Sequence, residues 1–210
     1  MELNVVNALM GQGKTSAAIN YINNAPKDEH FIFCTPYLSE VDRVITACSD
    51  KEFIEPQKSP SKRQQFKELV TNKKNVATTH SLFSNIDSET RKLIKDNNYT
   101  LILDETIETI SQLVLSSSDR EFIASLCEFD NKGCATWNSV KGTAYMKSIE
   151  TMCNCHNLYC ANNDFVQLLP IENFKAFSKV FILTYLYEAS FTAYYFQMFE
   201  IQSKYWWIQG

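Results

Sequence analysis

Two groups of residues in this chain have the types and spacing for phosphate chemistry. The first lies near the amino terminus and reads Ala8-Leu9-Met10-Gly11-Gln12-Gly13-Lys14-Thr15. Glycines let such a loop bend until its backbone N–H groups converge on an anion at the start of the next helix. In the GK[ST] pattern the lysine reaches the β and γ phosphates, and the following hydroxyl binds Mg²⁺. We therefore expect the nucleotide to be bound by Gly11, Gln12, Gly13, Lys14, Thr15 and Ser16.

The second group is an acidic pair, Asp104 and Glu105, directly behind the apolar run Leu101-Ile102-Leu103. Ligands of open parallel sheets bind at the carboxyl ends of the strands. We expect Asp104 to share Mg²⁺ with Thr15, and Glu105 to act with Lys14 in catalysis by activating the attacking water. Taken separately, the acidic pair also fits an exposed turn, and the first segment fits a glycine turn without a ligand.

Two further loops carry hydroxyl groups behind expected strands, and a cluster of thiols lies farther along. Hydroxyl and N–H groups at a sheet edge can bind successive phosphates without reading bases. Ser39 and Ser81 suit helix N-caps equally well, so capping stays an alternative for these loops. The loops comprise Thr35, Pro36 and Tyr37, and then Thr78, Thr79 and His80.

Zinc ligands are present at Cys153, Cys155, His156 and Cys160, but within one short segment and without a C-x2-C pair. This spacing favours structural cysteines and leaves the metal question open. The seven cysteines are an odd number, and no leader or membrane-spanning segment is recognisable. We therefore expect a protein of the cytoplasm, or of the host cytoplasm if phage-encoded, with no membrane partner.

The elements that must position these residues alternate along the chain. Apolar runs predict strands over 3–7, 31–35, 75–79, 100–103 and 180–184, and intervening patterns predict helices over 16–23, 39–48, 62–71 and 88–97. This alternation indicates an α/β domain with a mostly parallel sheet flanked by helices. We expect one domain over 1–210, with an insertion over 107–172 that holds helices at 119–129 and 143–153 and a hairpin of 158–161 and 165–169.

Four stretches together resemble the N-terminal RecA-like motor domain of superfamily 2, or DExx-box, helicases, in particular the helicase-like proteins of phages. Ala8 to Thr15 matches the A-x-x-G-x-G-K-T form of that family's first motif, and Asp104-Glu105 matches the DE of its box. The Thr35 and Thr78 loops match the places where the family touches the nucleic-acid backbone. A looser match, Leu183-Thr184-Tyr185, falls at the family's coupling motif and implies a coupling role for Thr184.

The resemblance implies ATP and Mg²⁺ as ligands, DNA or RNA as partner, and a second RecA-like motor domain that this chain does not contain. Hydrolysis without that domain is expected to be weak, because an arginine from the far side is missing. A net charge of −4 excludes tight nucleic-acid binding by bulk electrostatics alone. Two alternatives stay open, a small P-loop nucleoside kinase and a module that binds nucleotide or nucleic acid without turnover.

Overall fold

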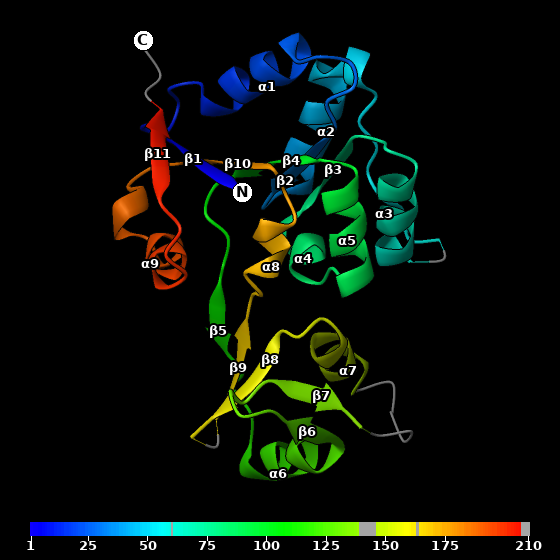
Figure 1. Ribbon diagram of the computed structural model, residues 1–210, viewed down its shortest axis with the longest axis vertical. Helices are drawn as coiled ribbons and strands as arrows, with labels where there is room; N and C mark the ends of the chain where they lie inside the picture. The colour runs from blue at the N-terminus through cyan, green and yellow to red at the C-terminus, as the bar shows by residue number, and fades with distance from the viewer. Residues whose placement is uncertain (60, 139–145, 163, 207–210) are drawn as a thin grey trace. The chain divides into compact units, whose positions relative to one another are not determined.

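A parallel β-sheet organises the part of the chain that carries both motifs. The computed structural model describes residues 1–59, 61–138, 146–162 and 164–206 (Figure 1). The chain divides into two compact units, the first made of Met1–Ile107 and Ile171–Gly210 and the second of Glu108–Pro170. The second unit lies within the range expected for an insertion, 107–172.

Six strands of the first unit, counted over the described residues, pair in the order β11-β1-β10-β4-β2-β3, and every neighbouring pair is parallel. Their bounds are β1 Glu2–Asn7, β2 Phe31–Thr35, β3 Val76–Thr79, β4 Thr100–Asp104, β10 Lys179–Thr184 and β11 Ser203–Trp206. All five residues of β2 and of β4 are buried, as expected for strands that are covered on both faces. Since the strands are parallel, the residues behind β1, β2, β4 and β10 meet at one edge of the sheet.

Helices cover both faces of this sheet (Figure 1). One face packs on α1 and α2 through a hydrophobic cluster that includes Ala18, Ile22, Val41 and Val44. The other face carries α4, α5 and α8, with Phe83 and Phe174 in ring contact at 5.5 Å. The helices are α1 Lys14–Asn24, α2 Leu38–Ala47, α3 Lys62–Thr71, α4 His80–Ser84, α5 Ser88–Asp96, α8 Glu172–Lys175 and α9 Phe191–Met198, with 3₁₀ turns η1 Ser49–Lys51 and η3 Tyr187–Ala189.

The second unit is a small α+β module with its own hydrophobic cluster, which includes Ile123, Cys153 and Phe165. Its elements are β5 Ile110–Gln112, α6 Ser117–Leu126, β6 Cys127–Phe129, β7 Ala135–Trp137, α7 Lys147–Asn154, β8 Leu158–Ala161 and β9 Asp164–Leu168. β8 and β9 pair antiparallel, which confirms the expected hairpin apart from Asn163, a residue outside those described.

The α/β architecture with a mostly parallel, helix-flanked sheet is confirmed, and several elements need correction. The helix expected over 119–129 ends at Leu126, because Cys127–Phe129 pairs with β7 as a strand. The start of the helix expected over 143–153 lies outside the described residues. The strand over 180–184 is not the last one, since β11 follows it and pairs with β1. No helix in the described parts of the chain is both long and apolar enough to cross a membrane.

Candidate nucleotide-binding site

The loop between β1 and α1 presents an open helix N-terminus at the carboxyl edge of the sheet. Gly11 and Gly13 have φ angles of 80° and 78°, a left-handed conformation that glycine adopts without strain. A Cβ built on either glycine meets nothing within 4 Å, so backbone conformation, not space, requires glycine here. Among the described residues no side chain caps α1. Its first N–H groups are therefore left for an anion, which the helix dipole also favours.

Lys14 and Thr15 begin α1 and lie next to the acidic motif. The Lys14 ammonium is buried and donates hydrogen bonds to the carbonyl oxygens of Ala8 (2.9 Å) and Leu9 (3.2 Å). The Thr15 hydroxyl donates to Asp104 Oδ1 at 3.1 Å, across 89 residues of sequence. The parallel arrangement of β1 and β4 thus brings the two motifs into direct contact.

Burial governs the ionisation of Asp104. It raises the pKa of this carboxyl, and the nearby carboxylates of Glu105 and Glu40 raise it further. The hydrogen bond from Thr15 and the charge of Lys14 lower the pKa and offset part of this effect. A carboxylate crowded by two others, with a hydroxyl at 3.1 Å, has the oxygen donors and the excess negative charge that suit Mg²⁺.

Strand β10 lies between β1 and β4, and its end links the two motifs. Thr184 accepts the N–H of Ala8 at its backbone oxygen (3.0 Å) and donates its own hydroxyl to Glu105 Oε2 (3.2 Å). The Glu105 N–H donates to the Leu183 carbonyl at 2.9 Å, while Glu105 itself has a φ of 68°. A non-glycine residue in this strained conformation, fixed by a neighbouring strand, is typical of functional sites.

These groups surround a cavity of about 380 Å³, here called the edge cavity. It is lined by Met10, Gly11, Gly13, Lys14, Thr15, Ser16, Thr35, Pro36, Tyr37, Glu40, Arg43, Asp104 and Glu105. The Thr35 hydroxyl is buried and has no hydrogen-bond partner within the described part of the chain, so it is free to bind a ligand or water.

Sequence reasoning missed Glu40 and Arg43, which α2 brings to the edge cavity. The Arg43 guanidinium contacts Glu40 Oε2 at 3.1 Å and Ser16 Oγ at 3.5 Å. The sequence signal that could have identified them is their position in the first turns of a helix that starts at the carboxyl edge of the sheet. A lone arginine on an amphipathic helix is otherwise indistinguishable from a solvated surface residue.

The residues expected to contact nucleic acid differ in exposure. Pro36 and Tyr37 are exposed beside the edge cavity, and Thr79 is half-buried, whereas the Thr35 and Thr78 side chains are buried. His80 Nε2 is also buried, and burial lowers the pKa of His80 to about 4, opposed in part by the backbone of Asp104 and Cys34. The imidazole is therefore neutral at pH 7.

The basic helix α3 is largely neutralised by acidic neighbours. Lys62 contacts Glu55 at 2.6 Å, Arg63 contacts Asp87 at 3.9 Å, and Lys67 is paired with Glu89. These ion pairs reduce the positive charge that α3 could offer to a nucleic acid.

The cysteines of the second unit do not assemble with other ligands. Within the described residues, no group of three or more metal-ligating side chains could hold an ion. Cys153 and Cys155 are buried, His156 is exposed, and the Cys153 Sγ lies 3.7 Å from the Sγ of Cys127.

Comparisons with known proteins reach a phage-derived relative. No family model matches the chain, and no solved structure matches it. Over 213 residues the chain is 33% identical to the "SPbeta prophage-derived uncharacterized protein YonV" of Bacillus subtilis (strain 168). The alignment covers 94% of this chain and 52% of that protein, so the chain spans about half the length of the curated relative that it matches.

Proposed function

We propose that this chain is the ATP-binding and ATP-hydrolysing N-terminal RecA-like motor domain of a DNA or RNA helicase-like protein of phage type. The observation that carries this proposal is the 3.1 Å hydrogen bond between Thr15 and Asp104 at the open N-terminus of α1. It joins the phosphate-binding motif to the acidic motif within one cavity. ATP hydrolysis requires both in the same place.

Binding of the triphosphate follows from the loop geometry. The N–H groups at the start of α1 would hold the phosphates, and the Lys14 ammonium would exchange the Ala8 and Leu9 carbonyls for phosphate oxygens. Thr15 and Asp104 are the residues that would hold Mg²⁺, which neutralises phosphate charge when bound. Arg43 lines the same cavity and supplies a second cation for the phosphates.

Hydrolysis would use Glu105 to orient the attacking water and accept its proton. Thr184 holds Glu105 through the 3.2 Å hydrogen bond and also binds the N–H of Ala8, the first residue of the phosphate loop. A shift of the loop Ala8 to Thr15 would therefore change the position of Glu105. This link supports the coupling role that the family resemblance implies for Thr184.

Coupling to nucleic acid would run through the exposed residues beside the edge cavity. Pro36 and Tyr37 follow β2, and the half-buried Thr79 ends β3, at the carboxyl edge where backbone phosphates could bind without base recognition. A net charge of −4 makes such binding weak for this chain alone, so a second motor domain is the expected partner.

Titration calorimetry with Mg²⁺ and ATP, together with phosphate release, tests the proposal. Lys14→Ala should abolish measurable ATP binding, whereas Glu105→Gln should leave the ATP dissociation constant within about threefold and reduce hydrolysis at least 100-fold. Lys92→Ala is the matched control, since Lys92 is exposed and pairs with Asp96 along α5, away from the residues that line the edge cavity. Binding that survives Lys14→Ala would contradict the proposal.

A second assay separates a motor from a kinase. Phosphate release is measured with and without single-stranded DNA or RNA, and then with thymidine as an acceptor. Stimulation by nucleic acid supports the motor domain. Formation of a phosphorylated nucleoside would overturn it in favour of a nucleoside kinase.

A further inference from the structure

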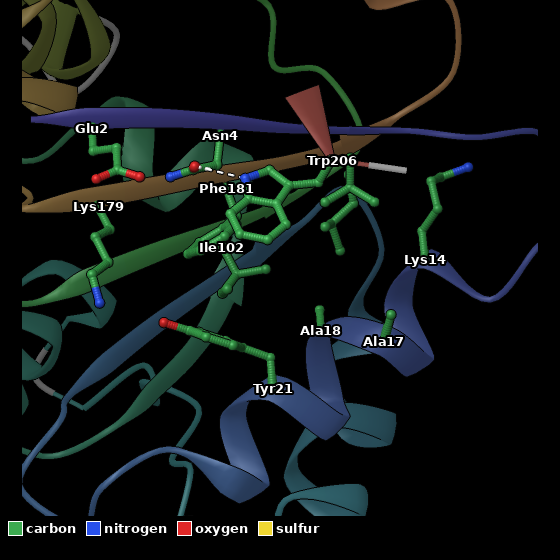
Figure 2. Close-up of a pocket in the computed structure, with 12 residues that line it drawn as sticks. Glu2, Asn4, Lys14, Ala17, Ala18, Tyr21, Ile102, Lys179, Phe181 and Trp206 are labelled. Atoms are coloured by element: carbon green, nitrogen blue, oxygen red, sulfur yellow. Dashed lines mark hydrogen bonds between the residues drawn. The ribbon is translucent and has the colours of Figure 1, made fainter. Parts of the chain in front are cut away.

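A second cavity, here called the α1 cavity, lies between α1 and the face of the sheet. Its volume is about 510 Å³, within the usual range of small-molecule sites. On the sheet side it is lined by Phe181 and Ile102, and the Trp206 indole reaches into it from β11 (Figure 2). Ala17 and Ala18 of α1 face this wall, so an apolar slot stays open where larger side chains would close it.

One polar side chain in this apolar wall lacks a partner. Asn4 is 1% exposed, and its Oδ1 accepts the Trp206 Nε1 hydrogen at 2.8 Å (Figure 2). The indole N–H can only donate, so it fixes which end of the amide faces it. Asn4 lines the cavity, and its Nδ2 group is a buried donor that has no hydrogen-bond partner among the described residues. A buried donor without a partner is costly, and an acceptor on a ligand would remove that cost.

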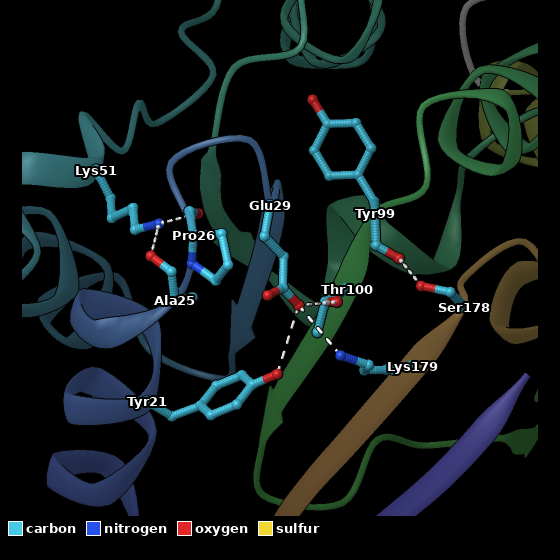
Figure 3. Close-up of polar contacts among 9 residues, drawn as sticks. All are labelled: Tyr21, Ala25, Pro26, Glu29, Lys51, Tyr99, Thr100, Ser178 and Lys179. Carbon is cyan, nitrogen blue, oxygen red and sulfur yellow. Dashed lines mark hydrogen bonds and ion pairs between the residues drawn. The ribbon is translucent and has the colours of Figure 1, made fainter.

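Two charged residues that line the cavity have ionic partners. Glu2 pairs with Lys204 at 3.3 Å, and Lys179 pairs with Glu29 (Figure 3). Glu29 Oε1 accepts from the Tyr21 hydroxyl at 3.4 Å and from Thr100 at 3.1 Å, and the Lys179 ammonium lies 3.6 Å away. Burial and the Glu29 carboxylate raise the pKa of Tyr21, so its hydroxyl stays a donor. Because the charges of these residues are compensated, an occupant does not need a charge of its own.

We propose that the α1 cavity binds a neutral, planar aromatic molecule whose hydrogen-bond acceptor takes the free hydrogen of Asn4 Nδ2. The ring lies in the slot between the Trp206 indole and the two alanines of α1, where aromatic stacking adds to the burial of apolar surface. The site is separate from the edge cavity, although the Lys14 side chain borders both.

Coumarin is a suitable probe, since it is a neutral flat bicycle with a carbonyl acceptor and no donor. Naphthalene, kept below its solubility limit, is the matched ligand without an acceptor. Saturation-transfer NMR and calorimetry should give a coumarin dissociation constant of roughly 0.1–1 mM, the range for a ligand of about ten heavy atoms. These measurements need no nucleotide, so their result is independent of the proposed ATPase activity.

Two variants locate the probe. Asn4→Asp keeps an oxygen for Trp206 but removes the donor. It should weaken the binding of coumarin at least tenfold and change the dissociation constant of naphthalene less than twofold. Ala17→Phe fills the slot from an exposed position of α1 and should abolish the binding of both ligands. Ala124→Phe makes the same change at an exposed helical alanine of α6 and should have no effect. Circular dichroism verifies that each variant is folded.

Several outcomes overturn the proposal. Absence of coumarin binding to the unmodified chain would do so, as would binding that persists in Ala17→Phe. Equal loss of coumarin and naphthalene in Asn4→Asp would remove the role of the amide. If coumarin fails to bind and sedimentation shows self-association that Ala17→Phe abolishes, the cavity belongs to an interface between copies of this chain.

Discussion

His80 illustrates how burial controls the charge of a single side chain at the edge of the sheet. Its Nε2 is buried, and burial lowers its pKa to about 4 from an ordinary value of 6.5. Between these pH values the unfolded chain binds a proton that the folded chain excludes. Stability is therefore fully present above pH 6.5 and is lost as the pH falls toward 4.

We predict that the free energy of unfolding falls by about 2 kcal/mol between pH 7.5 and pH 5 because of this residue. His80→Gln should remove that part of the pH dependence, since an amide does not titrate. Urea unfolding at the two pH values measures the difference, and His156→Gln, at an exposed histidine of the second unit, serves as the control. An unchanged pH slope in His80→Gln would show that the imidazole does not stay neutral when folded.

Asp104 carries the opposite type of shift. Its raised pKa, caused first by burial, means that the ionised carboxylate is less stable in the folded chain than in the unfolded one. This cost is absent below the unfolded pKa, appears as the pH rises through the folded pKa, and persists at pH 7.

We predict that Asp104→Asn melts a few degrees above the unmodified protein at pH 7 in the absence of nucleotide and Mg²⁺. The same variant should lose the stabilisation that Mg²⁺-ATP gives to the unmodified chain. Differential scanning calorimetry with and without the ligands measures both effects. A lower melting temperature for the ligand-free variant would contradict the assigned burial cost.

At the scale of elements, β10 connects the two motifs as well as completing the sheet. Inserted between β1 and β4, it ends where the phosphate loop and the acidic pair meet, and its Thr184 contacts both. In the proposed function, this geometry gives Thr184 the role of a positioning residue that acts through Glu105.

We predict that Thr184→Val lowers ATP hydrolysis about tenfold and leaves the ATP dissociation constant within twofold, because only the orientation of Glu105 is lost. Thr184→Ser retains the hydroxyl and should restore most of the rate. Steady-state kinetics with calorimetric binding separates the two parameters. Equal losses in the valine and serine variants would indicate a packing role instead.

The sequence correctly predicted the elements whose structure depends mainly on their own residues. The buried strands β2 and β4 contain continuous apolar runs, and the loop before α1 follows from glycines that adopt positive φ. β11 was missed because its four residues depend on pairing with β1, about 200 positions away, and follow an aromatic helix. Cys127–Phe129 continues a helical pattern but pairs with β7, so tertiary contacts override local preference there.

The candidate site was predictable to the same extent. Motif spacing identified Lys14, Thr15, Asp104 and Glu105, whose meeting in one cavity follows from parallel strands. Arg43 and the α1 cavity were not predictable, because each depends on how a helix rotates against the sheet. That rotation is set by packing of Val41, Val44, Ala18 and Ile22, and no local pattern encodes it.

At the scale of the whole molecule, the chain builds separate hydrophobic clusters in its two units. Phe33 belongs to the cluster under α1 and α2, and Phe165 belongs to the cluster of the second unit, with both side chains buried. Truncation of a buried phenylalanine costs about 3–5 kcal/mol through lost burial and the cavity left behind.

We predict that Phe165→Ala accelerates hydrogen exchange across Glu108–Pro170 and leaves the ATP dissociation constant within twofold. Phe33→Ala is the matched truncation in the first unit and should weaken ATP binding as well as protection. Mass spectrometry measures the rate of hydrogen exchange, and calorimetry measures the affinity for ATP. Loss of ATP binding in Phe165→Ala would mean that the two clusters act as one cooperative unit.

The position of Lys14 beside both cavities links the ligands that the two cavities would bind. Lys14 lines both the α1 cavity and the edge cavity, and its ammonium donates to the carbonyl oxygens of Ala8 and Leu9. We therefore expect a molecule that contacts Lys14 in the α1 cavity to restrict this side chain and so to change the affinity of the edge cavity for phosphate. Thermodynamic reciprocity makes that change the same factor in both directions. If both proposed sites are occupied as inferred, a flat, uncharged compound without a phosphate would change the affinity of this chain for a triphosphate.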